Sequence, residues 1–307
     1  MALTIEFKLN IIQWNCQSLI PKLSELDSYL HKEKVHICIL SETWLQSEHQ
    51  INFTGYSVFR KDRADGYAGL AILVHESINS CLKTIVSNYN NIDILCLEIL
   101  NSKKLQYIIG VYSPANITVS VGDYQELFSY FSEKTLIVGD FNAHHTAWSY
   151  ITDTRGRILS DTSINYNYVF LNNGDFTRCA KLNDNIICTS PDISFCSADL
   201  SLDFDWNVTK ESLGSDHLII SIKTLDSTKN SPELKRNIKK ANWVEYTQHI
   251  KSAFERVDYG NDIQSDYNKL IEVIEESATK NIPYIKTGFN PNKFKPNHGG
   301  NLIYRRQ

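Results

Sequence analysis

The sequence predicts an α/β protein in which helices cover β-sheets, and two patterns support this prediction. Short apolar runs rich in Ile, Val, Leu, Tyr and Phe recur from residue 8 to about residue 223, as is typical of strands. Between some of these runs, apolar residues repeat with the three-to-four spacing of a helix. A chain that mixes helices with many strands builds sheets covered by helices. At 307 residues and 42% hydrophobic composition, the chain can bury a sizeable core.

The expected elements follow one another along the first two thirds of the chain, without an internal repeat. The strands are expected at residues 9–14, 36–41, 56–60, 69–75, 94–100, 105–112, 135–140, 192–197 and 217–222. Two helices are expected between them, because each pattern gathers its apolar residues on one face. The first helix covers residues 22–34 with Leu23, Leu26 and Leu30, and the second covers residues 123–134 with Tyr124, Leu127, Phe128 and Phe131.

The composition changes after residue 223, and this change sets the expected domain boundaries. Residues 8–223 are expected to form the main domain, and the polar, charged residues 224–240 are typical of a linker. Residues 241–285 are expected to be helical, because apolar residues recur at three-to-four spacing up to Pro283. Residues 286–307 are basic, rich in Asn, Pro and Gly, and carry no acid, so disorder is expected there.

The charge and the absence of apolar stretches limit the function classes. The net charge of −4 argues against a protein that coats nucleic acid tightly and non-specifically, but it does not exclude a nuclease that needs carboxylates for metal. The basic run 235–240 is either a nuclear signal or, more commonly for such runs, a solvated linker. Neither a signal peptide nor an apolar run of membrane-spanning length occurs, so a nuclear or cytoplasmic protein without membrane contact is expected.

The seven cysteines favour buried, reduced thiols over a disulfide framework or a zinc site. They are odd in number and scattered, most of them lie in apolar runs, and no CxxC pair occurs.

Polar residues that can bind metal or phosphate lie at the ends of the expected strands. Four of them follow an apolar run directly, and three precede one. If neighbouring strands run in suitable directions, these groups converge on one rim of the sheets, where α/β proteins usually hold ligands. The residues are Asn15, Glu42, Tyr112 and Asp140 at the carboxyl ends, and Asp192, Asp216 and His217 at the amino ends.

Asp140 and Asn142 form a second signal within this set. In an extended chain both would point the same way, with Phe141 anchored in the core on the opposite side. Taken alone, this segment is as compatible with a polar turn as with catalysis, because Asp and Asn are favoured in turns. The recurrence of such groups along the chain is what favours a catalytic centre.

Seven motifs resemble the endonuclease/exonuclease/phosphatase superfamily, and more narrowly the endonuclease domain of jockey-like non-LTR retrotransposons, which is similar to apurinic/apyrimidinic endonucleases. The resemblance covers residues 8 to about 223. The motifs are Gln13-Trp-Asn-Cys-Gln-Ser-Leu19, Leu40-Ser-Glu-Thr-Trp44, Arg60-Lys-Asp-Arg63 before Gly69-Leu-Ala-Ile72, Val111-Tyr-Ser-Pro114, Val138-Gly-Asp-Phe-Asn-Ala-His144, Thr189-Ser-Pro-Asp-Ile-Ser194 and Gly214-Ser-Asp-His-Leu218.

The resemblance implies a DNase I-like fold and a metal-dependent reaction. The implied fold is a four-layer sandwich of two mixed β-sheets, face to face, flanked by helices. The implied activity is hydrolysis of a phosphodiester with Mg²⁺, for which Mn²⁺ is a possible substitute. Glu42, Asn15 and Asp216 would lie at the metal, and oxygen ligands of this kind suit a hard cation. Whether one or two metal ions take part is left open.

The resemblance also implies roles for the remaining residues. Asp140 would activate the attacking water, and Asn142 would hold that water or the phosphate. His217 would stabilise the phosphate, with Asp192 fixing its imidazole, and Tyr112 would contact a phosphate oxygen. Arg63 and His144 are expected at the substrate, although Arg63 could instead brace a loop and His144 could instead brace Asp140. Asp216 and His217 can both reach the site only if they lie in the loop before their strand, because neighbouring residues of a strand point to opposite faces.

The expected function is therefore the nicking of double-stranded DNA by an enzyme of retroelement origin. Because no Tyr-x-Asp-Asp polymerase motif is present, the chain would be a truncated, partial or domesticated element. Two alternatives stay open. One is a phosphatase of the same superfamily that acts on a lipid or small phosphoester, and the other is an inactive relic used as a binding module.

Overall fold

The computed structural model describes residues 8–64, 66–85, 91–100, 102, 104–183, 185–225, 240–256, 260 and 263–283. The chain separates into two compact units, Met1–Ser227 and Thr228–Gln307. The expected linker lies almost wholly outside the described residues, and the expected disordered tail lies outside them altogether.

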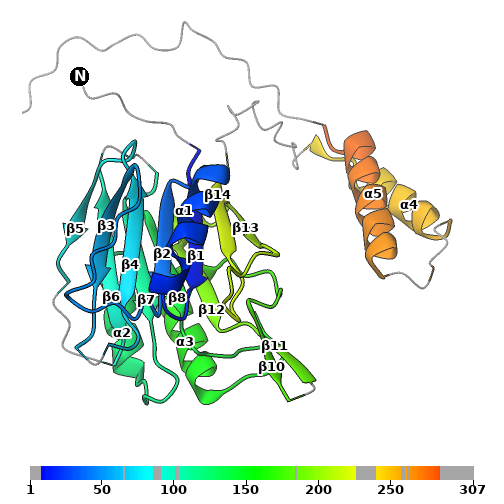
Figure 1. Ribbon diagram of the computed structural model, residues 1–307. Coiled ribbons are helices and arrows are strands. Elements are labelled where there is room, and N and C mark those ends of the chain that lie inside the picture. Colours follow the sequence, from blue (N-terminus) through cyan, green and yellow to red (C-terminus); the bar gives the residue numbers. More distant parts are fainter. Residues whose placement is uncertain are drawn as a thin grey trace, which may run out of the picture. The chain divides into compact units, whose positions relative to one another are not determined.

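Two six-stranded sheets form the centre of unit 1 (Figure 1). In the first sheet the order is β13-β14-β1-β2-β4-β3, and only β1 and β2 are parallel among its pairs. In the second the order is β5-β6-β7-β8-β12-β9, with β7 and β8 as its parallel pair. The first sheet contains β1 (Asn10–Asn15), β2 (Ile37–Ser41), β3 (Tyr56–Lys61), β4 (Leu70–His75), β13 (Phe204–Val208) and β14 (Ile220–Thr224). The second contains β5 (Ser80–Lys83), β6 (Asp93–Ile99), β7 (Tyr107–Tyr112), β8 (Thr135–Asp140), β9 (Tyr168–Phe170) and β12 (Asp192–Ser197).

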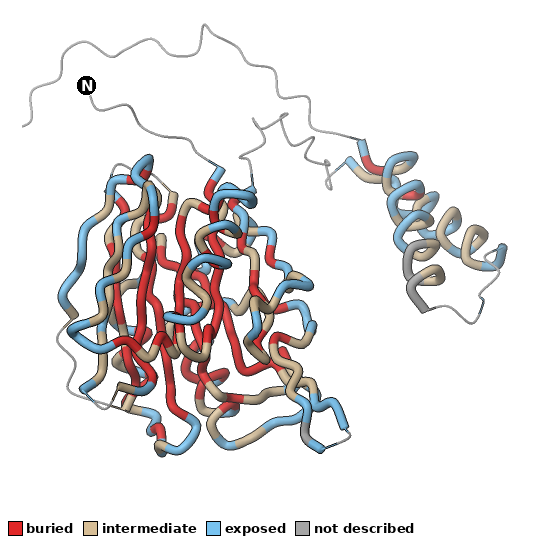
Figure 2. The backbone as a smooth tube through the Cα atoms, in the orientation of Figure 1, coloured by how far each residue is buried: buried red, intermediate tan, exposed pale blue. Residues whose placement is uncertain are grey.

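Three apolar clusters separate four layers, as the resemblance implies. One cluster lies between the sheets and includes Ile11 and Leu136, while alternate residues of the same strands face outward. On the outer face of the first sheet, Ile12 packs against α1 (Leu23–Lys32). On the outer face of the second, Ile137 packs with α2 (Val121–Ser129) and α3 (Thr154–Asn165). The strands are therefore buried on both faces along the middle of the sandwich (Figure 2). The expected fold class is confirmed.

The helices begin where their caps place them. Ser120 and Asp123 form a reciprocal capping box at the start of α2. Asp153 caps α3 by accepting a hydrogen bond from the amide of Gly156. The expected helix at 123–134 ends sooner, at Ser129, and Phe131 stacks on Tyr107 from the following turn.

All nine expected strands are present, but the sequence patterns missed one helix and several short strands. Helix α3 and strands β5, β9 and β13 were missed, as were the 3-10 turns η1 (Ile20–Lys22) and η2 (Ala198–Leu200). Also missed was a separate hairpin of β10 (Arg178–Leu182) and β11 (Asn185–Thr189), which projects beyond the sheets (Figure 1). Its strands are mostly exposed or half-buried, and β11 contains only the three-residue apolar run Ile186–Cys188, which is too short for the strand prediction.

The hairpin also corrects the cysteine prediction. Cys179 and Cys188 stand opposite one another in β10 and β11 and form a disulfide, with a Cα–Cα distance of 4.2 Å. The expectation of seven thiols is wrong for this pair, because direct pairing across an antiparallel ribbon brings two scattered cysteines together. The other five are free: Cys16, Cys38, Cys96 and Cys196 are buried and Cys81 is exposed.

Unit 2 contains two helices, α4 (Trp243–Phe254) and α5 (Ile263–Asn281), at the places where helical spacing was seen. Asn242 caps α4 by accepting a hydrogen bond from the amide of Glu245. The helices contact each other, and His249 Nδ1 lies 2.8 Å from the Ser277 hydroxyl. Neither these nor the other described helices have the length and hydropathy of a membrane span.

Candidate active site

Parallel and antiparallel pairing places the predicted residues at one rim of the sandwich. In the first sheet, Asn15 ends β1, and Glu42 directly follows β2, the strand parallel to it. In the second, Tyr112 and Asp140 are paired at the ends of β7 and β8. Asp192 begins β12 directly opposite Asp140, since β12 runs antiparallel to β8.

Asn15 joins the two sheets at this rim. Its side-chain nitrogen donates to Glu42 Oε1 and to Asp140 Oδ2, both at 2.8 Å. Its side-chain oxygen accepts a hydrogen bond from the amide of Gln17. Asn15 is fully buried, so it holds the two carboxylates side by side in a site with little solvent.

Asp192 and His217 form a buried pair. His217 Nδ1 lies 2.7 Å from Asp192 Oδ2, which also accepts a hydrogen bond from the hydroxyl of Thr177 at 2.7 Å. The other oxygen of Asp192 accepts a hydrogen bond from the side chain of Gln13 at 2.9 Å. These contacts fix the imidazole by its Nδ1 edge and leave Nε2 directed toward Asp216, whose Oδ1 is 3.7 Å away.

Asp216 and His217 lie in the loop before their strand, as they must if both side chains are to reach the site. Strand β14 begins only at Ile220, so both residues lie in the loop before it. The backbone amide of His217 donates to the hydroxyl of Ser215, and its carbonyl accepts from the indole of Trp14. Both side chains therefore reach the rim together.

Within the described part of the chain, only one of the two carboxylate oxygens of Asp216 accepts a hydrogen bond. Its Oδ2 accepts a hydrogen bond from Nε of Arg178 at 2.8 Å and forms an ion pair with Nη2 of the same residue at 2.6 Å. Its Oδ1 is buried and, among the described residues, has no hydrogen-bond partner. Burying a carboxylate oxygen without a partner costs free energy, unless a cation or a hydrogen-bond donor binds it.

Asn142 reaches the rim, but not by the expected route. Phe141 is buried in the outer cluster of the second sheet, as predicted. Strand β8 ends at Asp140, however, and Asn142 has a φ of 45°, so strand alternation does not apply to it. Its amide proton is instead donated to Asp140 Oδ1 at 2.9 Å, and its side chain donates to the carbonyl of Ser113 at 3.1 Å.

Backbone strain is concentrated in the rim loops. Glu42 has a φ of 52°, and several other non-glycine residues in these loops also have positive φ. Such conformations are costly and persist where the surrounding structure imposes them, often at functional sites. Besides Glu42 and Asn142, they are Gln17, Ser18, Trp44, Ala68 and Leu213.

The remaining predicted residues lie in less central places. Tyr112 is buried between Glu42 and Asp140, whose charges act on it. Arg63 forms an ion pair with Asp93, at 3.4 Å between Nη1 and Oδ2, and Asp93 is the strand partner of Tyr112. The backbone amide of His144 donates to Asp153, and its Nδ1 has no hydrogen-bond partner among the described residues.

Burial and neighbouring charges shift three pKa values at the rim. Burial and the adjacent Asp192 raise the pKa of Asp140 to about 7, although His217 and Asn15 act in the opposite direction. Burial by itself lowers the pKa of His217, but Asp192 and the other nearby carboxylates outweigh it and raise the pKa to about 9. Burial, with Glu42 and Asp140, raises the pKa of Tyr112, so its hydroxyl stays protonated.

The donor atoms fit a hard divalent cation. Asp140, Asp192 and His217 place potential ligand atoms within 4.8 Å of one another. However, Asp192 already makes three side-chain hydrogen bonds, and the raised pKa of His217 keeps it protonated at neutral pH, so this trio is better suited to proton and phosphate chemistry. A metal ion would be coordinated by the unpaired Oδ1 of Asp216 and by the carboxylate of Glu42.

Three contacting residues were not predicted from the sequence: Gln13, Thr177 and Arg178. Gln13 had a usable signal, because it is a polar residue inside an apolar strand. Thr177 and Arg178 had none, since Thr177 directly precedes the missed hairpin and Arg178 is its first residue.

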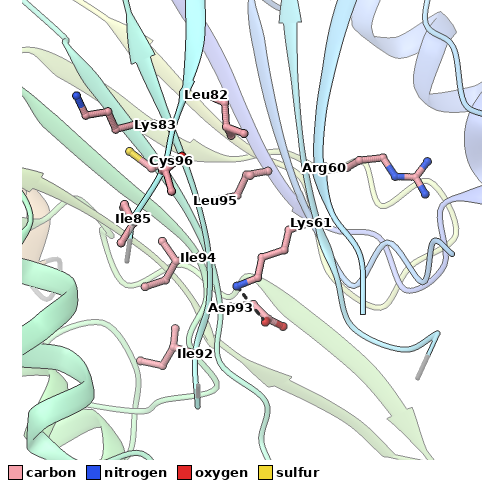
Figure 3. A pocket seen from close by; sticks show the side chains of 11 residues that line it. Arg60, Lys61, Leu82, Lys83, Ile85, Ile92, Asp93, Ile94, Leu95 and Cys96 are labelled. Carbon is pink, nitrogen blue, oxygen red and sulfur yellow. Dashed lines mark ion pairs between the residues drawn. The ribbon is translucent and has the colours of Figure 1, made fainter. Parts of the chain in front are cut away.

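A pocket of about 440 Å³ lies elsewhere, between the edges of the two sheets (Figure 3). It is lined by residues of β3, β5 and β6, and none of the predicted site residues lines it. Lys61 and Asp93 face each other across it as an ion pair at 3.6 Å. The pocket therefore adjoins the rim through Asp93 without being part of the catalytic arrangement.

Comparison with known proteins agrees with this geometry. Residues 106–221, from β7 to β14, match the family described as endonuclease-reverse transcriptase. The probable RNA-directed DNA polymerase from transposon BS of Drosophila melanogaster is 22% identical over 295 residues, covering 92% of this chain and 32% of that protein. The RNA-directed DNA polymerase from mobile element jockey of the same organism is 24% identical over 288 residues, covering 89% and 31%. The chain thus spans about a third of the length of these relatives.

Solved structures share the fold. The endonuclease domain of TRAS1, a telomere-specific non-LTR retrotransposon, matches with a TM-score of 0.59 and 22% identity, covering 72% of this chain and 99% of that one. The apurinic/apyrimidinic endonuclease LMAP from Leishmania major matches with a TM-score of 0.57 and 15% identity, covering 71% and 87%. Unit 1 therefore shares its fold with these nucleases. The expected DNase I-like arrangement of two mixed sheets flanked by helices is confirmed.

Proposed function

We propose that the chain is a Mg²⁺-dependent endonuclease that nicks double-stranded DNA and derives from a non-LTR retrotransposon. The observation that carries the proposal is the meeting, at one rim, of the Glu42–Asn15–Asp140 cluster, the half-satisfied Asp216 and the buried Asp192–His217 pair. The transposon relatives and the shared fold with nucleases support the choice of substrate class.

Glu42 and Asp216 would hold the metal. Bound Mg²⁺ supplies positive charge that polarises the phosphodiester and lowers the cost of charge developing on it. Asn15 does not donate an oxygen in this arrangement but fixes the Glu42 carboxylate through its side-chain nitrogen. Tyr112, protonated and buried beside Glu42, would donate a hydrogen bond to a phosphate oxygen.

Asp140 would accept the proton of the attacking water. Its raised pKa makes it an effective base near neutral pH, and Asn15 and the amide of Asn142 orient its two oxygens. The water oxygen bonds to phosphorus, and the bond from phosphorus to the 3′ oxygen breaks. The 3′ oxygen takes a proton from solvent, which leaves a 5′ phosphate and a 3′ hydroxyl.

His217 would stabilise the phosphate through Nε2. Asp192 holds the other ring nitrogen, so the imidazole stays protonated and correctly oriented while charge accumulates on the non-bridging oxygens. In a complete retroelement, the new 3′ hydroxyl could serve as a primer for reverse transcription.

Nicking of supercoiled plasmid tests the proposal. The protein should convert supercoiled plasmid to open circles in Mg²⁺, more weakly or with altered specificity in Mn²⁺, and not in EDTA. His217→Ala should lower the rate by about 10²–10³-fold, as expected for removal of a donor to the developing charge. Absence of nicking by folded wild-type protein in either metal would overturn the proposal, and release of phosphate from a lipid or small phosphoester would favour a phosphatase.

A further inference from the structure

The base of the β10–β11 hairpin is fixed against the active-site loop. Arg178, the first residue of β10, forms a β-bridge with His217, and the amide of Cys179 donates to the carbonyl of Asp216 at 2.8 Å. The amide of Leu218 donates to the carbonyl of Thr177 at 2.7 Å. Next to Arg178, the Cys179–Cys188 disulfide ties the two strands together. The backbone of Arg178 is therefore positioned as firmly as the site residues themselves.

The guanidinium group of Arg178 uses only one of its edges. Nε and Nη2 both contact Oδ2 of Asp216, whereas Nη1 has no hydrogen-bond partner among the residues that the structure describes. The side chain is 39% exposed. An arginine presents five donors in a planar fork, so this geometry leaves donors free at the rim beside a carboxylate that is expected to hold metal.

Other arginines of unit 1 are used differently. Arg155 donates to four or more backbone carbonyls, including those of Ser113 and Phe141, and so braces loops. Arg60 is surrounded by Asp62 and two carbonyls. Arg157 lies exposed on α3. By contrast, Arg178 pairs with a side chain of the candidate site.

The pairing has an electrostatic consequence. Without a cation, the charge of Asp216 is compensated mainly by Arg178, which contacts Oδ2 at 2.6 Å, and secondarily by His217, whose Nε2 is 3.7 Å from Oδ1. A divalent cation on the orphaned Oδ1 of Asp216 would compensate the same carboxylate from its other side, which leaves the positive charge of Arg178 in excess. An uncompensated guanidinium with free donors at the mouth of the site is suited to a phosphate group.

We propose that Arg178 binds a backbone phosphate of the DNA substrate next to the site of cleavage. The assignment rests on the proposed function for the identity of the substrate. In it, Arg178 bridges Asp216 and the nucleic acid, so that occupation of the metal site and binding of the DNA backbone reinforce one another.

DNA binding separates this role from a structural one. The test uses the full chain, a fluorescent 20-base-pair duplex in Ca²⁺ or EDTA, and a series of salt concentrations. Arg178→Gln should weaken binding about tenfold and reduce the slope of log affinity against log salt by about 1, as expected for the loss of one phosphate contact. Arg178→Lys should keep most of the slope and recover part of the affinity.

Arg157→Gln is the matched control, because it removes the same charge from the same unit at an exposed position away from the site. Its salt slope should equal that of the wild type. Equal slopes for Arg178→Gln, Arg178→Lys and wild type, in protein with unchanged circular dichroism, would overturn the proposal. If Arg178→Gln does not fold, the affinities of Arg178→Lys and Arg157→Lys decide. Arg178→Lys should bind the duplex more weakly than Arg157→Lys, because lysine keeps the charge but not the planar fork of donors, and equal affinities would overturn the proposal.

The affinity of the metal-binding site for Mg²⁺ gives a second test, because loosened packing would not raise this affinity. Because Arg178 competes for Asp216, Arg178→Gln should lower the Mg²⁺ concentration that gives half of the metal-induced rise in melting temperature, in the absence of DNA. A higher requirement for Mg²⁺ would contradict the shared use of Asp216. If the wild type does not nick plasmid but the slopes differ as expected, the proposed function fails while the phosphate contact stands.

Discussion

At the scale of single residues, Gln13 and Asn15 show how one strand can organise a site between two sheets. They are two positions apart in β1, so both point between the sheets, whereas Ile12 and Trp14 point toward α1. Gln13 holds Asp192, and Asn15 holds Asp140 with Glu42. Two polar side chains of one strand thus fix carboxylates of both sheets.

The raised pKa of Asp140 predicts a pH-dependent loss of stability in the metal-free protein. Its folded pKa of about 7 exceeds the ordinary value of 3.8, so the folded state binds the extra proton and its stabilising effect is lost as pH rises between these values. The melting temperature in EDTA should therefore fall from about pH 4 to about pH 7, and Asp140→Asn should flatten this decline. Thermal unfolding followed by circular dichroism measures both. An equally steep decline in the variant would contradict the assignment.

The pair of Asp192 and His217 predicts the shape of the pH–rate profile. Nicking should need ionised Asp140 and protonated His217, so the profile should have an acid limb set by the raised pKa of Asp140 and an alkaline limb set by the raised pKa of His217. Asp192→Asn removes the charge that raises the pKa of His217, so the alkaline limb should move toward 6.5. The exposed Asp205 supplies the control, because Asp205→Asn should leave both limbs in place. An unmoved alkaline limb in Asp192→Asn would show that another group titrates there.

At the scale of elements, the close approach of β7 and β8 sets the position of Asp140. Gly139 precedes it, and a Cβ at this position would overlap the carbonyl of Val111 in the neighbouring strand. The parallel pairing that aligns Tyr112 with Asp140 therefore requires glycine one residue earlier.

Gly139→Ala should consequently destabilise unit 1 by about 3 kcal/mol or more, because the backbone of β7 cannot yield as a flexible side chain would. The midpoint of urea unfolding measures the effect. Gly174→Ala is the comparison: its Cβ would meet no atom within 4 Å, so only the cost of its positive φ, about 1 kcal/mol, is expected. Similar losses for the two variants would argue against the close approach.

Elements differed in how well the sequence predicted them. The nine predicted strands are held by periodic or continuous apolar residues that face the core, and this signal is local. Helix α3 escaped because its buried residues include Gly156, Ser160, Thr162 and Ser163, which carry no apolar stripe. The β10–β11 hairpin was not predicted, because its stability depends on contacts that are not local in sequence. These are the pairing of its two strands, the disulfide between them, and the backbone hydrogen bonds from the start of β10 to the loop that contains Asp216.

At the scale of the whole molecule, the two units each have their own internal contacts. All three large apolar clusters belong to residues 9–222, within unit 1. In unit 2, α4 has no buried residue, and the described part of α5 buries Ser277. Two helices that bury so little gain little stability from tertiary packing, which is the main source of helix stability in proteins.

A chain ending at Ser227 should therefore keep the fold and the nicking activity of unit 1. Its melting temperature should lie within about 2 °C of the full chain, because no part of its three clusters is removed. The complementary piece, residues 228–307, should show weak helical circular dichroism. Loss of folding or of nicking in the shorter chain would reveal that unit 2 supports the site.

The sequence alone determined where most of the strands lie along the chain, the polar residues at the ends of several of them, and the kinds of side chain available at the rim. These follow from local periodicity and from motifs that need no knowledge of what they touch. Only the tertiary structure decided the partners: Gln13 reaches Asp192 across 179 residues, Asn15 reaches Asp140 across 125, and Arg178 reaches Asp216 across 38. Such contacts depend on the register of strands in two stacked sheets, and a one-residue slip would turn each side chain to the opposite face. For that reason a pattern along the chain could locate the rim, but not the hydrogen bonds that complete it.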